Sequence, residues 1–191
     1  MKATTKKEFE KLRREPITVV PYDASWPEHY EELEHALKRI LPRRLVQRIA
    51  HIGSTAVPGL SAKPIIDVQV EVCDMDEVVN DVAPIMVDAG YQFIWRRSIG
   101  EKDPYYAWFI RRNATGERTE HIHVVSPDQA SVDRIVFRDH LRHYPEEASA
   151  YDELKAQLVK KYAKDRDAYT RGKSEFIDRV LQDARHQRIR K

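Results

Sequence analysis

A single cysteine and the absence of any long apolar run limit what this 191-residue chain can be. Cys73 has no second cysteine with which to form an internal disulfide, which is typical of a reducing compartment. No stretch approaches the roughly 20 apolar residues of a membrane helix, and residues 1–14 lack the apolar centre of a secretory signal. We therefore expect a cytoplasmic protein without a membrane segment. Cys73 follows an apolar strand pattern, so we expect a small buried side chain rather than a nucleophile.

Neither sign of charge is in excess either. The formal net charge is +2, and no basic stripe with interleaved aromatic residues is present, which disfavours nucleic acid as a partner. Hydrophobic residues make up 41% of the chain and charged residues 34%, enough for one core with a well-hydrated surface. We divide the chain into a polar N-terminal arm (1–16), one domain (17–185) and a short basic tail (186–191).

The order of apolar patterns defines the fold class. Strands are predicted at 46–52, 65–72, 91–95, 105–111 and 120–125. Helices are predicted at 26–41, at 75–89 with a kink at Pro84, and throughout the chain from 128 onward. This order predicts an α/β (α+β) fold, a mixed sheet flanked by helices with a helical C-terminal part.

A glycine-containing turn follows the first predicted strand. Gly53 lets a phosphate approach the backbone, and free N–H groups together with the hydroxyls of Ser54 and Thr55 are suitable donors to its oxygens. The alternative is an ordinary turn, because Gly and Ser are common there and no P-loop sequence is present.

The next strand carries a carboxylate in apolar surroundings. Because strand side chains alternate, Asp67, Gln69 and Glu71 share one face. A buried Asp67 must be paired, hydrogen-bonded or bound to a metal, and Mg²⁺ needs one or two carboxylates plus phosphates and water. The alternative is a solvated sheet face.

A histidine pair marks the last predicted strand. His121 and His123 point the same way, whereas Glu120 points to the opposite face. If this strand lies beside that of Asp67, two imidazoles and a carboxylate become a possible site for Zn²⁺, Mn²⁺ or Fe²⁺. The alternative is that both histidines hydrogen-bond neighbours on a polar face.

Cations in the loop and the C-terminal helices are candidates to bind phosphate. Lys63 ends the loop before the Asp67 strand, and the Arg138 guanidinium is suited to clamping a phosphate through two hydrogen bonds. Lys155 and Lys173 are weaker candidates, since helix lysines are usually solvated. The aromatic side chains of Tyr105, Tyr106, Trp108 and Phe109 are possible base-stacking surfaces, although core packing explains most of them better.

Several of these stretches together resemble the GrpB family of small nucleotidyltransferase-like proteins. The similar stretches are HIGSTAVPGL (51–60), KPIID (63–67), HIHV (121–124), FRDHLR (137–142) and Tyr169 with KSEFI (173–177). The resemblance spans 17–183 and implies a nucleotidyltransferase-like fold with an NTP and Mg²⁺ pocket at the Gly-Ser turn. The chain departs from the wider superfamily at Gln69, where active members usually have a second acid, and this places two-metal catalysis in doubt.

The leading hypothesis is an enzyme that transfers a nucleotidyl or phosphoryl group from an NTP such as ATP to an unknown acceptor, with Mg²⁺ (or Mn²⁺). The expected catalytic residues are Asp67, His121 and His123, the metal ligands Asp67, Gln69 and His123, and the phosphate-binding residues Gly53, Ser54, Thr55, Lys63, Arg138 and Lys173. One alternative is a catalytically silent module that binds a nucleotide or other phosphate-bearing metabolite and regulates a protein partner. Another is a metal-dependent hydrolase that uses the His pair. The sequence leaves the acceptor and the oligomeric state open.

Overall fold

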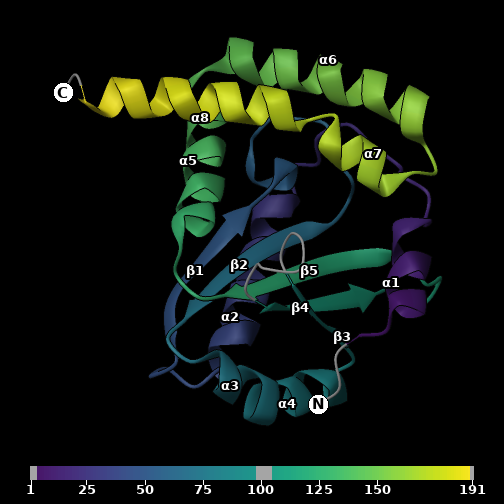
Figure 1. Cartoon of the computed structure of the whole chain (residues 1–191), viewed down its shortest axis with the longest axis vertical. Coiled ribbons are helices and arrows are strands. Elements are labelled where there is room, and N and C mark those ends of the chain that lie inside the picture. The colour runs from purple at the N-terminus through teal and green to yellow at the C-terminus, as the bar shows by residue number, and fades with distance from the viewer. Residues whose placement is uncertain (1–3, 98–104, 190–191) are drawn as a thin grey trace.

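The computed structural model describes residues 4–97 and 105–189 (Figure 1). The side chains of Tyr105 and Tyr106, named above as possible stacking surfaces, lie outside the described part, as do those of the basic tail beyond His186.

A five-stranded mixed sheet forms the centre of the fold, as the sequence predicts. Its strands are β1 (Val46–Ile52), β2 (Ile66–Val72), β3 (Gln92–Arg97), β4 (Tyr105–Arg112) and β5 (Arg118–Val125). Their order across the sheet is β1-β2-β5-β4-β3, with β2 and β5 parallel and the other neighbouring pairs antiparallel. The parallel pair lies at the middle of the sheet and joins segments far apart in the sequence.

One face of the sheet carries the main apolar core. Val68 and Val70 of β2 and Phe109 of β4 are fully buried there with Leu37 of α2 (Trp26–Ile40). The segment predicted as one helix at 75–89 also packs on this face, but it consists of α3 (Met75–Glu77), a π-helical turn η2 (Val78–Val82) and α4 (Ala83–Asp88). Pro84 lies at the start of α4, which continues directly from η2, so the π-helical turn comes just before the position where the missing N–H of proline interrupts helical hydrogen bonding.

The C-terminal helices are α5 (Gln129–His143), α6 (Pro145–Tyr162), α7 (Arg166–Arg171) and α8 (Ser174–Ile189). In Figure 1, α6 and α8 lie across one end of the molecule and α5 runs from them along the sheet. The rings of Tyr151 on α6 and Phe176 on α8, 5.2 Å apart, join these two helices. The motif of Tyr169 with KSEFI (173–177) does not lie in one helix, because Lys173 is in the turn between α7 and α8.

The N-terminal arm is also ordered against the domain. Helix α1 (Lys6–Arg13) begins with a capping box between Thr5 and Glu8, and Leu12 packs with Trp108 of β4. Glu15 then accepts hydrogen bonds from Arg112 at 2.7 Å and from the buried Arg118 at 2.6 Å. These contacts hold α1 on the sheet face opposite the main core.

Cys73 is exposed, contrary to the burial predicted from the sequence. It lies one residue beyond the end of β2, so the alternation that buries Val72 no longer applies to it. None of the described helices combines the length and the apolar character needed to span a bilayer.

The Glu15 contacts generate a stability prediction. In Glu15→Gln the Arg118 side chain, which is 3% exposed, loses its counter-charge, and we expect the free energy of unfolding in urea to fall by about 2 kcal/mol. Glu32→Gln, at an exposed position on α2, is the matched control and should change it by less than about 0.5 kcal/mol. Equal effects of the two substitutions would show that the contact contributes nothing to stability.

Candidate functional site

The register of β2 and β5 brings the acidic residue and the histidine pair together. In this parallel pair Asp67 is opposite His121, and Gln69 is opposite His123. His121 Nδ1 lies 2.9 Å from Asp67 Oδ1, and His123 Nε2 lies 3.5 Å from the same oxygen. The adjacency that the sequence left open is therefore present, and both imidazoles meet one carboxylate.

Burial and hydrogen bonding set the protonation of this group. Burial alone would raise the pKa of Asp67, but hydrogen bonds from His121 and His123 outweigh it and hold the pKa well below the usual range. Burial lowers the pKa of His121 to about 4 despite the neighbouring carboxylate. At neutral pH the arrangement is an ionised Asp67 that accepts a hydrogen bond from the Nδ1–H of a neutral His121.

The Gly53 turn packs directly against Asp67. Gly53 has φ +73°, a conformation that favours glycine, and a Cβ at this position would lie 2.7 Å from Asp67 Oδ2. The turn continues into a short 3₁₀ helix, Ser54–Ala56. Only a residue without a side chain fits between the turn and the carboxylate.

The two hydroxyls of the turn have different surroundings. Ser54 is partly exposed and lines a pocket beside Asp67. Thr55 is 2% exposed, its Oγ1 donates to the Ile65 carbonyl at 3.3 Å, and it lies 3.0 Å from His51 Nε2. Thr55 therefore fixes the shape of the turn, and Ser54 is the hydroxyl available to a ligand.

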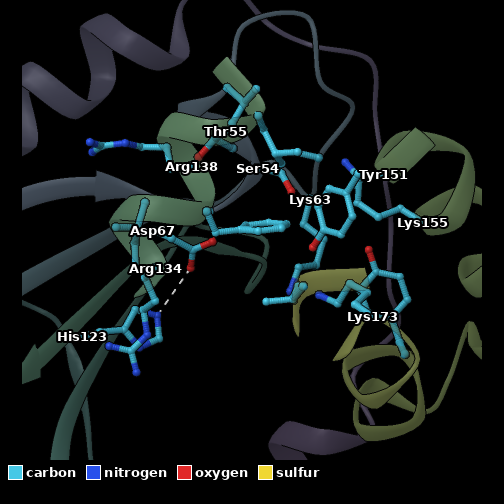
Figure 2. Close-up of a pocket in the computed structure, with 18 residues that line it drawn as sticks. Ser54, Thr55, Lys63, Asp67, His123, Arg134, Arg138, Tyr151, Lys155 and Lys173 are labelled. Atoms are coloured by element: carbon cyan, nitrogen blue, oxygen red, sulfur yellow. Dashed lines mark ion pairs between the residues drawn. The ribbon is translucent and has the colours of Figure 1, made fainter. Parts of the chain in front are cut away.

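The pocket has a volume of about 260 Å³ and lies between the Gly53 turn, β2, β5 and the C-terminal helices. Figure 2 shows Asp67 and His123 on one side of it and Lys155 and Lys173 on the other. Lys63 lies between the two groups. The pocket thus combines one carboxylate–imidazole wall with three lysines. Arg134 and Arg138 also line it, and side chains of the helices contribute further apolar contacts: Phe137, Leu141, Tyr151 and Ile177.

Burial lowers the pKa of all three lysines. It lowers the pKa of Lys173 to about 7, with repulsion from Lys63 adding to the effect. It lowers the pKa of Lys63 to about 8, although the charge of Asp67 opposes the shift. Lys155 is 2% exposed, and its Nζ donates to the Ser61 carbonyl and pairs with Asp152 at 3.1 Å. Two of the three ammonium groups therefore lose part of their charge near neutral pH.

Of two further residues that the sequence predicts at the site, Arg138 lines the pocket and Gln69 is not among its lining residues, and the polar groups of both bond to protein atoms. Gln69 is 1% exposed, its Nε2 donates to the Ser131 carbonyl at 3.0 Å, and its Oε1 accepts from Arg134 at 2.8 Å. Arg138 donates to the His51 carbonyl and to Asp139, both at 2.7 Å, and its guanidinium points away from the lysines in Figure 2. Gln69 thus joins β2 to α5, and the guanidinium of Arg138 is held by protein oxygens.

Lys155, Arg134 and Tyr151 are more prominent in the pocket than the sequence indicated. Lys155 had a detectable signal, because it lies on the same helical face as Tyr151 and Leu158, at spacings of four and three residues. A lysine within such an apolar face is buried when that face packs, as it does here. For Arg134 no comparable signal exists in the sequence.

The Gly53 turn generates a second prediction. Gly53→Ala should lower the free energy of unfolding in urea by about 1 kcal/mol for the positive φ, and by about 1–3 kcal/mol more for the overlap with Asp67. Gly116→Ala is the matched control, because Gly116 has φ +85° and nothing within 4 Å of the added Cβ. If both variants lose the same amount, the close packing of the turn on Asp67 is contradicted.

Comparison with known proteins agrees with this architecture. The model of the GrpB protein family matches residues 16–183. A UPF0157 protein of Pseudomonas aeruginosa is 40% identical over 166 residues, which span 86% of this chain and 66% of that protein. A crystal structure of the conserved protein GrpB from Enterococcus faecalis superposes with a TM-score of 0.73 at 31% identity, covering 87% of this chain and 96% of that one.

A shorter stretch of the chain is similar to part of a protein that is named as an enzyme. A dephospho-CoA kinase of Mycobacterium tuberculosis is 39% identical over 83 residues, which are 42% of this chain but 20% of the kinase. The family match covers residues 16–183, and the structural match covers 87% of the chain. The chain belongs to the GrpB family.

Proposed function

We propose that this chain binds a nucleoside triphosphate, such as ATP, by its phosphates and transfers a nucleotidyl or phosphoryl group to an acceptor. The observation that carries the proposal is the pocket in which the Gly53–Ser54 turn and the ionised Asp67 lie together with three lysines. Phosphoryl transfer requires a protein mainly to position the phosphates and to stabilise developing charge. The lysines and the backbone of the turn supply both.

The residues also fit a divalent cation, Mg²⁺ or Mn²⁺. Asp67 is ionised at neutral pH and lines the pocket together with His123, so its carboxylate is available to a cation that also contacts phosphate. When bound, such an ion neutralises phosphate charge and orients the reacting oxygens. The imidazole of His123, on the same wall, has one of two mutually exclusive roles: it is a further ligand of this cation, or it accepts a proton from an attacking hydroxyl.

The size of the pocket restricts how a nucleotide binds. Its 260 Å³ is below the range of about 300–1,000 Å³ that encloses a drug-sized ligand. The phosphates fit inside, whereas the ribose and base must extend toward solvent. Selection by the phosphate chain rather than by the base is therefore expected, and other phosphate-bearing molecules are plausible ligands.

Gln69 favours a second candidate, a module that binds such a ligand without turnover and regulates a protein partner. Its amide is held by Ser131, Glu71 and Arg134, so the site has no second carboxylate at this position. The segment shared with a dephospho-CoA kinase adds dephospho-CoA to the ligands worth testing. Nucleotide turnover that disappears in Asp67→Asn would exclude the silent module.

Ligand-induced stabilisation tests the proposal. We expect one or more NTPs with Mg²⁺ or Mn²⁺ to raise the melting temperature, because a ligand at 100 times its dissociation constant adds about 2.7 kcal/mol. Asp67→Asn should lose the metal-dependent part of the shift, and Lys173→Met most of the whole shift. Lys160→Met, at an exposed position on α6, should keep it. A folded wild-type chain that no nucleotide stabilises contradicts the proposal.

The lysine pKa values predict how binding depends on pH. Because the pKa of Lys173 is about 7 and that of Lys63 about 8, the empty pocket loses positive charge as the pH rises from about 7 to about 9. Affinity for tripolyphosphate should therefore fall over this range, by up to about tenfold per pH unit for each lysine that must be protonated. A bound anion raises both pKa values, so binding should take up protons.

Isothermal titration calorimetry at about pH 8 in two buffers of different ionisation enthalpy measures this uptake. Lys173→Met should reduce the number of protons taken up, and Lys160→Met should leave it unchanged. Binding without any proton uptake at this pH would mean that these lysines do not contact the anion.

A further inference from the structure

We propose that Asp67, His121 and His123 form a site for one transition-metal dication (Mn²⁺, Fe²⁺, Co²⁺ or Zn²⁺), which the chain binds without nucleotide and in preference to Mg²⁺. This inference deepens the proposed function, because it names the class of metal at the same wall of the pocket. The metal ligands differ from those expected from the sequence, because His121 takes the place of Gln69.

The distances between the ligand atoms carry the inference. Asp67 Oδ1 is 2.9 Å from His121 Nδ1 and 3.5 Å from His123 Nε2, and the three residues offer ligand atoms that all lie within 4.8 Å of one another. Zn²⁺ binds nitrogen and oxygen at about 2.0–2.2 Å, which places neighbouring ligands of a tetrahedron about 3.4 Å apart. Small rotations of the side chains, together with a shift of the His121 proton from Nδ1 to Nε2, would bring all three atoms to one ion.

The ligand types select the metal. Two imidazoles and one carboxylate suit Zn²⁺ and the first-row transition metals, whereas Mg²⁺ prefers oxygen ligands and gives up its water reluctantly. The two imidazoles would take the part that a second carboxylate plays in active nucleotidyltransferase-like proteins. One carboxylate neutralises only half of a dication, so the remaining positive charge favours an anionic phosphate as the next ligand.

Neighbouring side chains fix the two rings and exclude Gln69. Trp108 stacks on His123 with ring centroids 5.9 Å apart and meets the His121 ring edge to face at 4.9 Å. The oxygen of Gln69 accepts from the Arg134 guanidinium at 2.8 Å, and a cation on that oxygen would face this positive charge. Asp67 and His123 line the pocket, so the open coordination positions would face the ligand.

Cobalt titration of the metal-stripped full-length chain, without nucleotide, tests the inference. We expect one Co²⁺ per chain with a visible d–d absorption of a low-symmetry nitrogen and oxygen site, displaced by Zn²⁺ and not by Mg²⁺. Asp67→Asn and His123→Gln should each weaken the affinity by at least about 100-fold, more than typical losses of outer-sphere partners. His35→Gln, at an exposed position on α2, is the control and should bind like the wild type.

His121 is left unchanged in this test, because it is 5% exposed and its replacement could unfold the chain. The inference is overturned if the wild type shows no Co²⁺ site, or if binding is equal in Asp67→Asn, His123→Gln and His35→Gln. A nucleotide-induced shift in melting temperature with Mg²⁺ but no Co²⁺ site would overturn the inference and keep the proposed function. A Co²⁺ site formed by the expected residues, with no nucleotide-induced shift in melting temperature, would support the inference and contradict the proposed binding of a nucleotide.

Discussion

The parallel pairing of β2 with β5 is the constraint on which the site depends. Its register places Asp67 opposite His121, and a slip by one residue would turn the histidines to the other face of the sheet. The apolar residues on the opposite face, Val68 and Ile122, are fully buried and resist such a slip. The packing of the main core therefore imposes the contact between carboxylate and imidazole.

The helical C-terminal part completes the site by closing it. Tyr151 and Lys155 reach the pocket from α6, and Lys173 reaches it from the turn between α7 and α8. Burying ammonium groups costs free energy, which appears as the lowered pKa of Lys173 and Lys63. A fold that buries ammonium groups beside a glycine turn and a carboxylate, despite this cost in free energy, is suited to binding an anionic ligand.

Gln69 has a structural role at the wall of the site. On β2 it lies two residues after Asp67 on the same face, and its amide connects the strand to Ser131 and Arg134 of α5. A carboxylate there would lack the N–H that donates to the Ser131 carbonyl and would lie next to Glu71. The amide thus fits the junction between sheet and helix, and Asp67 supplies the negative charge of the pocket.

The sequence by itself determined the elements and the local chemistry: the strands that carry Asp67 and the histidines, the Gly53 turn, the C-terminal helices and the family. These follow from periodicities and motifs that extend over a few residues. The tertiary structure decided that Asp67 meets His121, 54 positions away, that Lys155 is buried, that Gln69 and Arg138 make other contacts, and that the N-terminal arm packs on the sheet. Strand order and helix docking depend on the packing of the whole chain, and a local pattern does not encode which distant segment becomes its neighbour.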